Sequence, residues 1–256
     1  MINLKSVIWP GIAILCMAAM SSHAAILNVP AGYPTIQDAI NAAVAGDDVH
    51  VAPGIYPENI TMKSSVNVYG GGAMGTMLTN PSPTIATNVT FDTVSTCTLA
   101  SFTITRADFT EDCYEWASAV YITASTDIVV QDCGIVNNDS SGIMVYDGSI
   151  ASILRCLLTG NANPSYGFGP AIYTNSSETR VEKCEIVNNN DYGIHSASAT
   201  GGALSIISWS ITPWPGSTSP AAGLTAFPLS KLSSTTSTIG YSDGEVGKDN
   251  VDNQPR

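Results

Sequence analysis

Positively charged residues are scarce in this sequence. Nine Lys and Arg stand against 21 Asp and Glu over 256 residues, which gives a formal net charge of −12, and only 12% of the residues are charged. A chain of this sign attracts neither the phosphate backbone of nucleic acids nor an anionic lipid surface, so both are excluded as electrostatic partners. Wholesale disorder is excluded as well, because 44% of the residues are apolar and the charge density is low.

Local patterns for metal binding are also absent. The six cysteines include no Cys-x-x-Cys pair, and none of the three histidines stands at ligand spacing from a second ligand. We therefore expect no metal site and no resident cofactor. A disulfide framework is not predicted either, because five cysteines follow the N-terminal apolar run, an odd number. One of them, Cys113, lies in a polar stretch and is the candidate for a free or bridged thiol.

Long apolar runs are missing except at the N-terminus. Lys5 is the one charged residue before an uncharged run over residues 7–20, and Ser22-His23-Ala24 then offers small residues before Ala25. This is the three-part organisation of a secretory signal peptide. The run is shorter than the roughly 20 residues that span a bilayer, which favours cleavage over a retained anchor. We predict that residues 1–24 are a signal peptide, that no membrane span remains after cleavage, and that the mature protein is secreted or at the cell surface.

A repeat organises the middle of the chain. Residues 130–138, 153–161 and 181–189 align on a cysteine that has an aliphatic residue three positions earlier, another two positions later, and an asparagine five positions later. A period in the twenties, built of short β-branched segments and Asn/Gly turns, is typical of a solenoid of β-coils. Equivalent residues of stacked coils then form ladders. The predicted ladder residues are Cys133, Cys156 and Cys184, and Asn138, Asn161 and Asn189.

The two ladders have different physical roles. Cysteines that line the interior act as small hydrophobic residues, and ladder side chains run parallel, so we expect them to be unbridged. Asparagine tolerates the left-handed backbone of a corner, and its amide can bond the asparagine above or below it. Asp132, Arg155 and Lys183 precede the ladder cysteines and alternate in sign, which we interpret as a surface salt-bridge ladder.

A short helix is predicted before the first coil. Apolar residues at 36, 39, 40 and 43 have helical spacing, and Thr35 is a plausible N-cap. Strands with alternating apolar residues follow at 49–51, 60–62 and 66–68. A helix placed over the first coil would cover its unpaired edge.

The helix and the coils together carry a family resemblance. Thr35-Ile-Gln-Asp-Ala-Ile-Asn-Ala-Ala43, followed by residues 46–60 and then by asparagine-rich repeats, resembles the pectin lyase-like superfamily, with repeats of the carbohydrate-binding and sugar-hydrolase type. The resemblance covers about residues 27–211 and implies an all-β fold, a right-handed parallel β-helix; the period gives about six or seven coils. We predict a β-helix domain over residues 25–212, including an N-terminal capping helix at 34–43. Residues 213–256 show no further coil and are predicted to be irregular or disordered.

The resemblance also implies a function related to polysaccharides. An enzyme of this superfamily would be a polysaccharide lyase or a glycoside hydrolase, with calcium as the cofactor of a lyase. The Asn-Thr-Asp, Asp-Asp and Gly-His-Gly set of polygalacturonases has no counterpart here, and Gln131-Asp132 is a bare dipeptide without the context of pectinesterases. Two functions therefore stay open: a secreted protein that binds a polysaccharide or cell-surface glycan, with or without degrading it, and a non-catalytic structural or adhesive scaffold.

Outward positions of the strand after each asparagine corner are rich in aromatic residues. The position between two inward residues is Tyr121, Met144, Tyr173 and His195 in successive coils. Aromatic faces beside carboxylates suit a sugar ring, although exposed tyrosine is also common in strands with no ligand. Inserts at 106–118 and 162–170 add further candidates. The predicted substrate-binding residues are Tyr114, Trp116, Tyr121, Tyr146, Tyr166, Tyr173 and Tyr192, and the predicted catalytic residues are Glu111, Asp112, Glu115 and His195.

Overall fold

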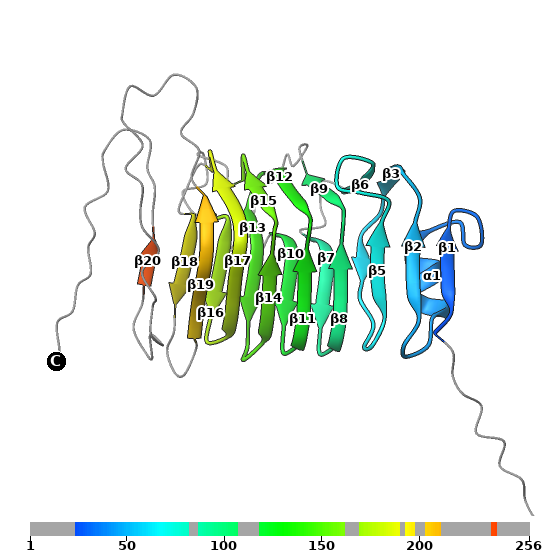
Figure 1. Cartoon of the computed structure of the whole chain (residues 1–256), viewed down its shortest axis with the longest axis horizontal. Helices are drawn as coiled ribbons and strands as arrows, with labels where there is room; N and C mark the ends of the chain where they lie inside the picture. The colour runs from blue at the N-terminus through cyan, green and yellow to red at the C-terminus, as the bar shows by residue number, and fades with distance from the viewer. Residues whose placement is uncertain are drawn as a thin grey trace, which may run out of the picture.

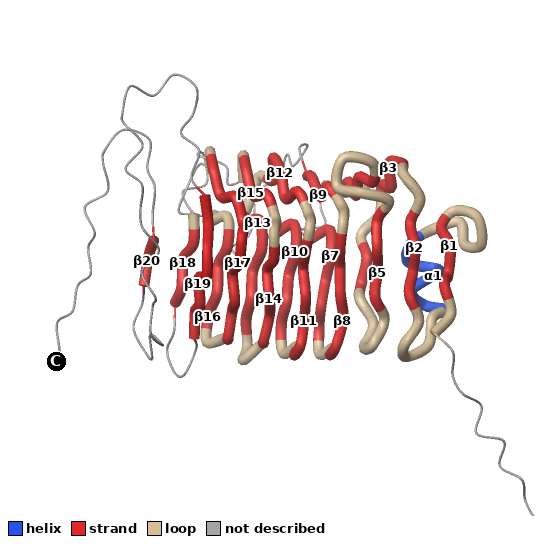
Figure 2. Tube along the Cα trace, in the orientation of Figure 1, coloured by secondary structure: helices blue, strands red, loops and turns tan. Residues whose placement is uncertain are grey.

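The chain folds as a stack of strands, drawn in Figure 1 for the computed structural model. The structure describes residues 24–81, 87–106, 118–161, 169–189, 193–197, 203–210 and 237–239. Within them, consecutive strands from Asp48–Val51 onward belong to different faces, and strands pair with their equivalents in the neighbouring coils. Figure 2 shows the result, a row of strands with one short helix at the end where the stack begins. This parallel β-helix confirms the predicted fold class.

Three faces make up the stack. The first face holds β1 (Ile26–Val29), β2 (Asp48–Val51), β5 (Asn67–Gly70), β8 (Ser95–Ala100), β11 (Thr126–Gln131), β14 (Ile150–Leu154), β17 (Glu178–Val187) and β19 (Ala203–Ser210). The second face holds β3 (Gly54–Pro57), β6 (Thr76–Thr79), β9 (Thr103–Arg106), β12 (Gly134–Asn138) and β15 (Leu157–Thr159), and β17 continues into it. The third face holds β4 (Ile60–Thr61), β7 (Thr87–Asp92), β10 (Ser118–Thr123), β13 (Ser141–Tyr146), β16 (Ile172–Asn175), β18 (Ile194–Ala197) and β20 (Ser237–Ile239).

The order of the strands gives six coils among the described residues. They are β2-β3-β4, β5-β6-β7, β8-β9-β10, β11-β12-β13, β14-β15-β16 and β17-β18, with β1 before them and β19 after them. This agrees with the expected six or seven. Among the described strands, neighbouring coils pair in parallel, and the one antiparallel pair joins β18 to β20. From residues 213–256, predicted to be irregular or disordered, the structure describes β20 alone.

The interior is a continuous apolar column. Val68, Leu99, Val130, Ile153 and Val181 are in register on successive strands of the first face, and each is fully buried. A single coil could not remove these side chains from water, whereas stacking buries each one against its equivalents. The stacked arrangement therefore follows from the aliphatic repeat of the sequence.

Helix α1 (Ile36–Ala42) covers the beginning of the column. Ile36, Ala39 and Ile40 are buried, and the Thr35 hydroxyl accepts a hydrogen bond from the Asp38 amide at 3.0 Å, which confirms the predicted cap. The described helix is neither long enough nor apolar enough to cross a membrane.

The asparagine ladder is continuous across three coils. Asn138 Nδ2 donates to Asn161 Oδ1 at 2.8 Å, and Asn161 Nδ2 donates to Asn189 Oδ1 at 2.9 Å. The predicted left-handed backbone belongs to the residues before the ladder, because Asn137, Gly160 and Asn188 have φ values of 53°, 66° and 53°. The left-handed residue turns the corner, so the next side chain points inward, where the stacked amides meet.

The corner residues before the cysteines differ in part from their predicted role. Asp132 and Arg155 form an ion pair at 2.6 Å, but Lys183 contacts Glu182 of its own strand at 3.5 Å and does not continue the ladder. Asp132, Arg155 and Lys183 all have φ values of 53–54°. Their shared property is therefore the left-handed turn, and their charges lie on the surface.

A third stack was not foreseen. Ser125, Ser149 and Ser177 lie at the corner between the third and first faces and are buried. The Ser149 hydroxyl accepts from the Ser125 amide at 3.1 Å, and the Ser125 hydroxyl accepts from the Val94 amide at the same distance. The recurrence of serine at the equivalent positions 125, 149 and 177 could have predicted this stack. Serine is so common in this chain, however, that the recurrence does not stand out.

Candidate functional site on the third face

Four aromatic rings lie on adjacent strands of the third face. Tyr121 of β10 and Tyr173 of β16 are both in register with Met144 of β13, and Tyr173 is in register with His195 of β18. Tyr146 lies two residues after Met144 and therefore on the same side of β13. We call Tyr121, Tyr146, Tyr173 and His195 the aromatic row.

The rings of the aromatic row contact one another in sequence. The ring centroids of Tyr121 and Tyr146 are 5.8 Å apart, those of Tyr146 and Tyr173 are 5.2 Å apart, and those of Tyr173 and His195 are 5.3 Å apart. The interplanar angles of 39°, 34° and 56° place them between stacked and edge-on geometry. These separations are favourable for aromatic pairs, so the row is held in place by its own contacts.

The members of the row differ in exposure. Tyr146 is 7% exposed and Met144 is fully buried, yet neither belongs to the interior apolar cluster. The prediction that Met144 is exposed was therefore wrong: this residue, in register between Tyr121 and Tyr173, is fully buried. Tyr121, Tyr173 and His195 are half-buried and provide the accessible surface.

Acidic and hydroxyl groups border the row on one side. Thr123 of β10 is in register with both Asp92 of β7 and Tyr146, and its hydroxyl donates to the Asp147 carboxylate at 2.8 Å. Asp92 accepts a hydrogen bond from the Thr93 hydroxyl at 2.9 Å. The strands described for this face contain no Lys or Arg. The third face thus presents hydrogen-bond acceptors beside aromatic rings, and the electrostatic potential of this surface is negative.

Much of the predicted site falls outside the described residues. Glu111, Asp112, Tyr114, Glu115 and Trp116 lie in segment 107–117, Tyr166 lies in 162–168, and Tyr192 lies in 190–192. Each of these segments precedes, in the sequence, a strand that carries a member of the row. Of the predicted catalytic and substrate-binding residues, the structure brings together Tyr121, Tyr146, Tyr173 and His195.

The ladder cysteines are structural in their surroundings. Cys97, Cys133, Cys156 and Cys184 are buried and have free thiols. Burial raises the pKa of Cys97, and the hydrogen bond with Cys156 together with burial raises the pKa of Cys184. Raised pKa values disfavour the nucleophilic thiolate at Cys97 and Cys184. The hydrogen bond with Cys156 lowers the pKa of Cys133, but this thiol is buried in the interior apolar cluster. Among the residues that the structure describes, no group of three His, Cys, Asp or Glu side chains is arranged to hold a metal ion.

A hollow that the sequence did not predict lies on the first face. His50 of β2 and Tyr69 of β5 are in register, and their rings meet edge to face at 5.5 Å. They line the hollow together with Asn28 and residues 29–31, among others. Burial, and to a lesser extent the nearby Asp48, raises the pKa of Tyr69. Outward aromatic residues at matching positions of successive strands were the signal that could have found it.

Comparison with solved structures places the fold. The chain is similar to pectin methylesterase from carrot, with 14% identity, a TM-score of 0.54 and coverage of 73% of this chain and 62% of the other. It is also similar to ORF18 of Geobacillus virus E2 (16% identity, TM-score 0.58, coverage 71% and 40%). A third similar structure is alginate lyase from Paenibacillus sp. str. FPU-7 (12% identity, TM-score 0.51, coverage 73% and 76%). The chain spans less than two thirds of the pectin methylesterase chains.

Comparison with protein families identifies the chain more directly. No curated protein sequence matches it. Residues 54–206, more than half of the chain, match the family described as the right handed beta helix region. These residues include the aromatic row, the cysteine and asparagine ladders and the serine stack. The chain therefore belongs to the right-handed β-helix family, in a pectin lyase-like fold.

Proposed function

We propose that this protein is exported and binds a neutral polysaccharide along the aromatic row. The observation that carries the proposal is the row itself, four rings on four adjacent strands with centroid separations of 5.2–5.8 Å. Sugars present apolar CH faces that stack on aromatic rings and hydroxyl groups that need polar partners. The row with its border of Asp92, Thr123 and Asp147 offers both.

The repeat of the row matches the nature of a polymer. Neighbouring strands of a sheet lie about 4.8 Å apart, so each coil presents its ring one short step after the previous one. A chain of sugar units that lies along the stack would meet equivalent groups in successive coils. In this arrangement Tyr146, which is almost covered, keeps its neighbours in position, while Tyr121, Tyr173 and His195 make the contacts.

Charge selects the class of polysaccharide. The described strands of the third face carry no Lys or Arg, and Asp92 and Asp147 are exposed beside the row. The formal charge of the chain is −12. A polyuronate would be repelled by this surface, whereas a neutral polymer can donate hydrogen bonds from its hydroxyl groups to the carboxylates.

The test is a binding titration with variants of the row. Calorimetry with a neutral glucan, a neutral galactomannan and a polyuronate of similar length should detect binding to a neutral polymer and none to the polyuronate. Tyr121→Ala and Tyr173→Ala should each weaken binding about fivefold, since loss of one stacking contact costs about 1 kcal/mol. Tyr69→Ala, a half-buried tyrosine on the first face, is the matched control and should bind normally.

Two results would contradict the proposal. Binding that survives both row substitutions but is lost with Tyr69→Ala would move the site to the first-face hollow. Binding to the polyuronate alone would show that charge does not select the ligand as argued. Thermal unfolding of each variant separates lost contacts from lost structure.

A structural or adhesive scaffold is the second candidate function. It is favoured by the burial of Tyr146 and Met144, which shows that the outer face of β13 is committed to contacts within the protein. In this case the substitutions Tyr121→Ala and Tyr173→Ala would lower the unfolding temperature, and no polymer of the panel would bind.

Cleavage of the bound polymer is a further part of the proposal. Glu111, Asp112, Glu115 and His195 are its candidate catalytic residues. Cleavage of a neutral polymer would be glycoside hydrolysis, whereas a lyase, for which calcium would be required, acts on a polyuronate and applies only if that polymer of the panel binds instead. Incubation of the panel with the protein, in calcium and in chelator, followed by size analysis of the polymers, tests it. Unchanged polymer sizes, both with calcium and with chelator, would show that the protein does not cleave these polymers and leave binding as its function.

A further inference from the structure

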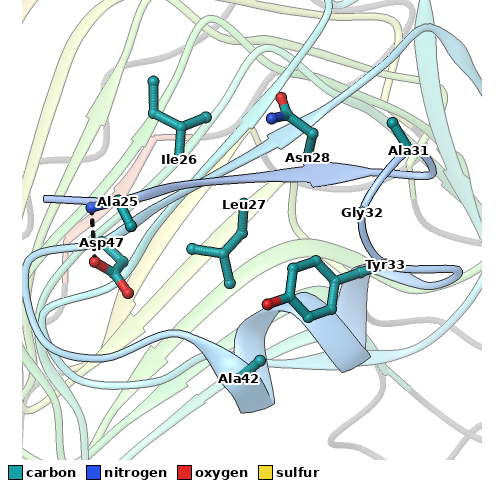
Figure 3. A pocket seen from close by; sticks show the side chains of 9 residues that line it. All are labelled: Ala25, Ile26, Leu27, Asn28, Ala31, Gly32, Tyr33, Ala42 and Asp47. Atoms are coloured by element: carbon teal, nitrogen blue, oxygen red, sulfur yellow. Dashed lines mark hydrogen bonds between the residues drawn. The ribbon is translucent and has the colours of Figure 1, made fainter.

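The backbone nitrogen of Ala25 rests on a buried carboxylate at the start of the stack. Asp47 Oδ1 accepts a hydrogen bond from the Ala25 nitrogen at 2.8 Å, and Asp47 Oδ2 accepts one from the Val44 amide at 2.8 Å. Figure 3 shows this contact at the edge of a hollow between β1 and α1, with Leu27 and Tyr33 among the lining residues. The carbonyl of Ala25 in turn accepts from the Asp48 amide at 2.9 Å, so this residue is held on both sides.

Asp47 is unusual among the acidic residues. It is 5% exposed, and it is the one buried carboxylate in the part of the chain that the structure describes. The hydrogen bonds from the Val44 and Ala25 amides, with a smaller effect of Lys63, lower the pKa of Asp47. A buried negative charge is costly unless a positive charge or several donors compensate it, and a full positive partner is not in direct contact with it here.

Ala25 is also the residue at which the sequence predicts cleavage of the signal peptide. Ser22 and Ala24 place small residues three positions and one position before this bond. The cleavage pattern depends on residues 1–24, whereas the Asp47 contact depends on the packing of β1 against residues 44–48. Two independent observations therefore select the same nitrogen atom.

We propose that export converts this amide hydrogen bond into an ion pair that fixes the N-terminal end of the β-helix. A signal peptidase hydrolyses the bond between the Ala24 carbonyl carbon and the Ala25 nitrogen; water supplies the hydroxyl to Ala24 and a proton to the released amine. The amine takes up a second proton and becomes an ammonium group on Asp47. Charge-assisted hydrogen bonds are roughly twice as strong as neutral ones, so the folded protein is more stable after processing. This inference rests on export and is independent of polysaccharide binding.

The pH dependence of the pair is set by its two members. The α-ammonium has a pKa of about 7.7 to 8.0 in an unfolded chain, and Asp47 raises it in the folded protein. The stabilisation by the ammonium group is complete at a pH below its pKa in the unfolded chain. It is lost as the pH rises through its pKa in the folded protein. The pKa of Asp47 is lowered, so its contribution is lost only in acid, as the pH falls through the folded value.

Other charged groups near the pair are engaged elsewhere. Lys63 Nζ donates to the carbonyls of Asn41 and Ala43, and the Asp48 carboxylate accepts from the Asn67 amide at 2.9 Å. Tyr33 lines the same hollow from the turn before α1. These groups are present before and after cleavage, so their titration cancels in a comparison of the two forms.

The experiment compares two forms of the chain that differ only before Ala25. The first form begins at Ala25, and the second carries Ser-Gly before Ala25, so that its nitrogen stays an amide. We expect urea unfolding to give an about tenfold larger folding equilibrium constant for the first form at pH 6, a difference that disappears above about pH 9.5 as the ammonium loses its proton. Asp47→Asn should remove the difference between the two forms at every pH.

Three outcomes would overturn the proposal. The first is an N-terminal residue other than Ala25 in the exported protein, as determined by mass spectrometry. Another is equal stability of the two forms between pH 5 and pH 9.5, a result that does not depend on how well Asp47→Asn folds. The third is a difference between the two forms that Asp47→Asn leaves unchanged.

Discussion

At the scale of single residues, the stack depends on a repeated pair of neighbours at one corner. A left-handed residue turns the chain, and the following asparagine places its amide inside. Gly160 shows how tight the turn is, since a Cβ atom there would lie 2.4 Å from the Asn137 Oδ1 atom. The amide also donates to a backbone carbonyl of the preceding coil, as Asn161 Nδ2 does to the Ile135 carbonyl at 2.9 Å.

Asn161→Ala should therefore destabilise the protein strongly. The side chain is fully buried and makes three hydrogen bonds: it accepts one from Asn138 and donates to Asn189 and to the Ile135 carbonyl. Its removal leaves buried polar groups without partners, and we expect the free energy of unfolding to fall by about 2 to 4 kcal/mol in urea titrations. Asn41→Ala, at an exposed position of α1, is the control and should change it by less than about 0.5 kcal/mol. Similar losses for both variants would show that the ladder does not stabilise the stack.

The sequence predicted the members of this ladder but misplaced the left-handed residue. Asn137 and Asn188 are asparagines but Gly160 is a glycine, so the position before the ladder is less regular than the inward asparagine, and the repeat marks only the latter. The alternating charges before the cysteines predicted a salt-bridge ladder that is not continuous. These positions share a left-handed turn, which tolerates Asp, Arg and Lys alike when the side chain is on the surface.

At the scale of elements, α1 is held by a residue that lies far from it in the sequence. The carboxylate of Glu58, in the connection between β3 and β4, accepts hydrogen bonds from the Ile36 and Gln37 amides at 3.1 and 3.2 Å. Thr35 satisfies a further amide of the first turn. A helix of seven residues is too short to be stable alone, so these contacts and its buried face maintain it.

Glu58→Ala should loosen α1 and with it the covered end of the stack. The substitution leaves two helix amides without their acceptor, and we expect a loss of about 1 to 2 kcal/mol in the free energy of unfolding. Glu178→Ala, which removes an exposed carboxylate at the start of β17, is the control and should have little effect. A loss for Glu178→Ala as large as that for Glu58→Ala would assign the effect to net charge.

At the scale of the whole molecule, the repeat predicted the architecture in part. The aliphatic, cysteine and asparagine positions recur with a period in the twenties, so a solenoid of about six or seven β-coils could be derived from spacing, whereas its right-handed parallel form was implied by the family resemblance. The site could be predicted only in part. Outward alternation located Tyr121, Tyr173 and His195, but the burial of Tyr146 and Met144 depends on contacts across three strands, which periodicity does not encode.

Edge protection is a property of the complete stack. The third face ends at β18, whose residues Ile194, His195 and Ser196 pair antiparallel with β20. Without β20, the backbone groups of β18 would be unpaired and could template association with another copy. The segment that supplies β20 is therefore expected to keep the β-helix monomeric.

Two truncations separate the effect of β20 from that of tail length. Deletion of residues 213–256 removes β20, whereas deletion of residues 240–256 retains it. Light scattering after size exclusion should show dimers or larger species for the first truncation at concentrations where the second is monomeric. The edge of β19 is the same in both, so it cannot cause a difference. If both truncations have the same mass distribution, β20 does not protect the edge, and the strands or turns of the last coil must limit association by themselves.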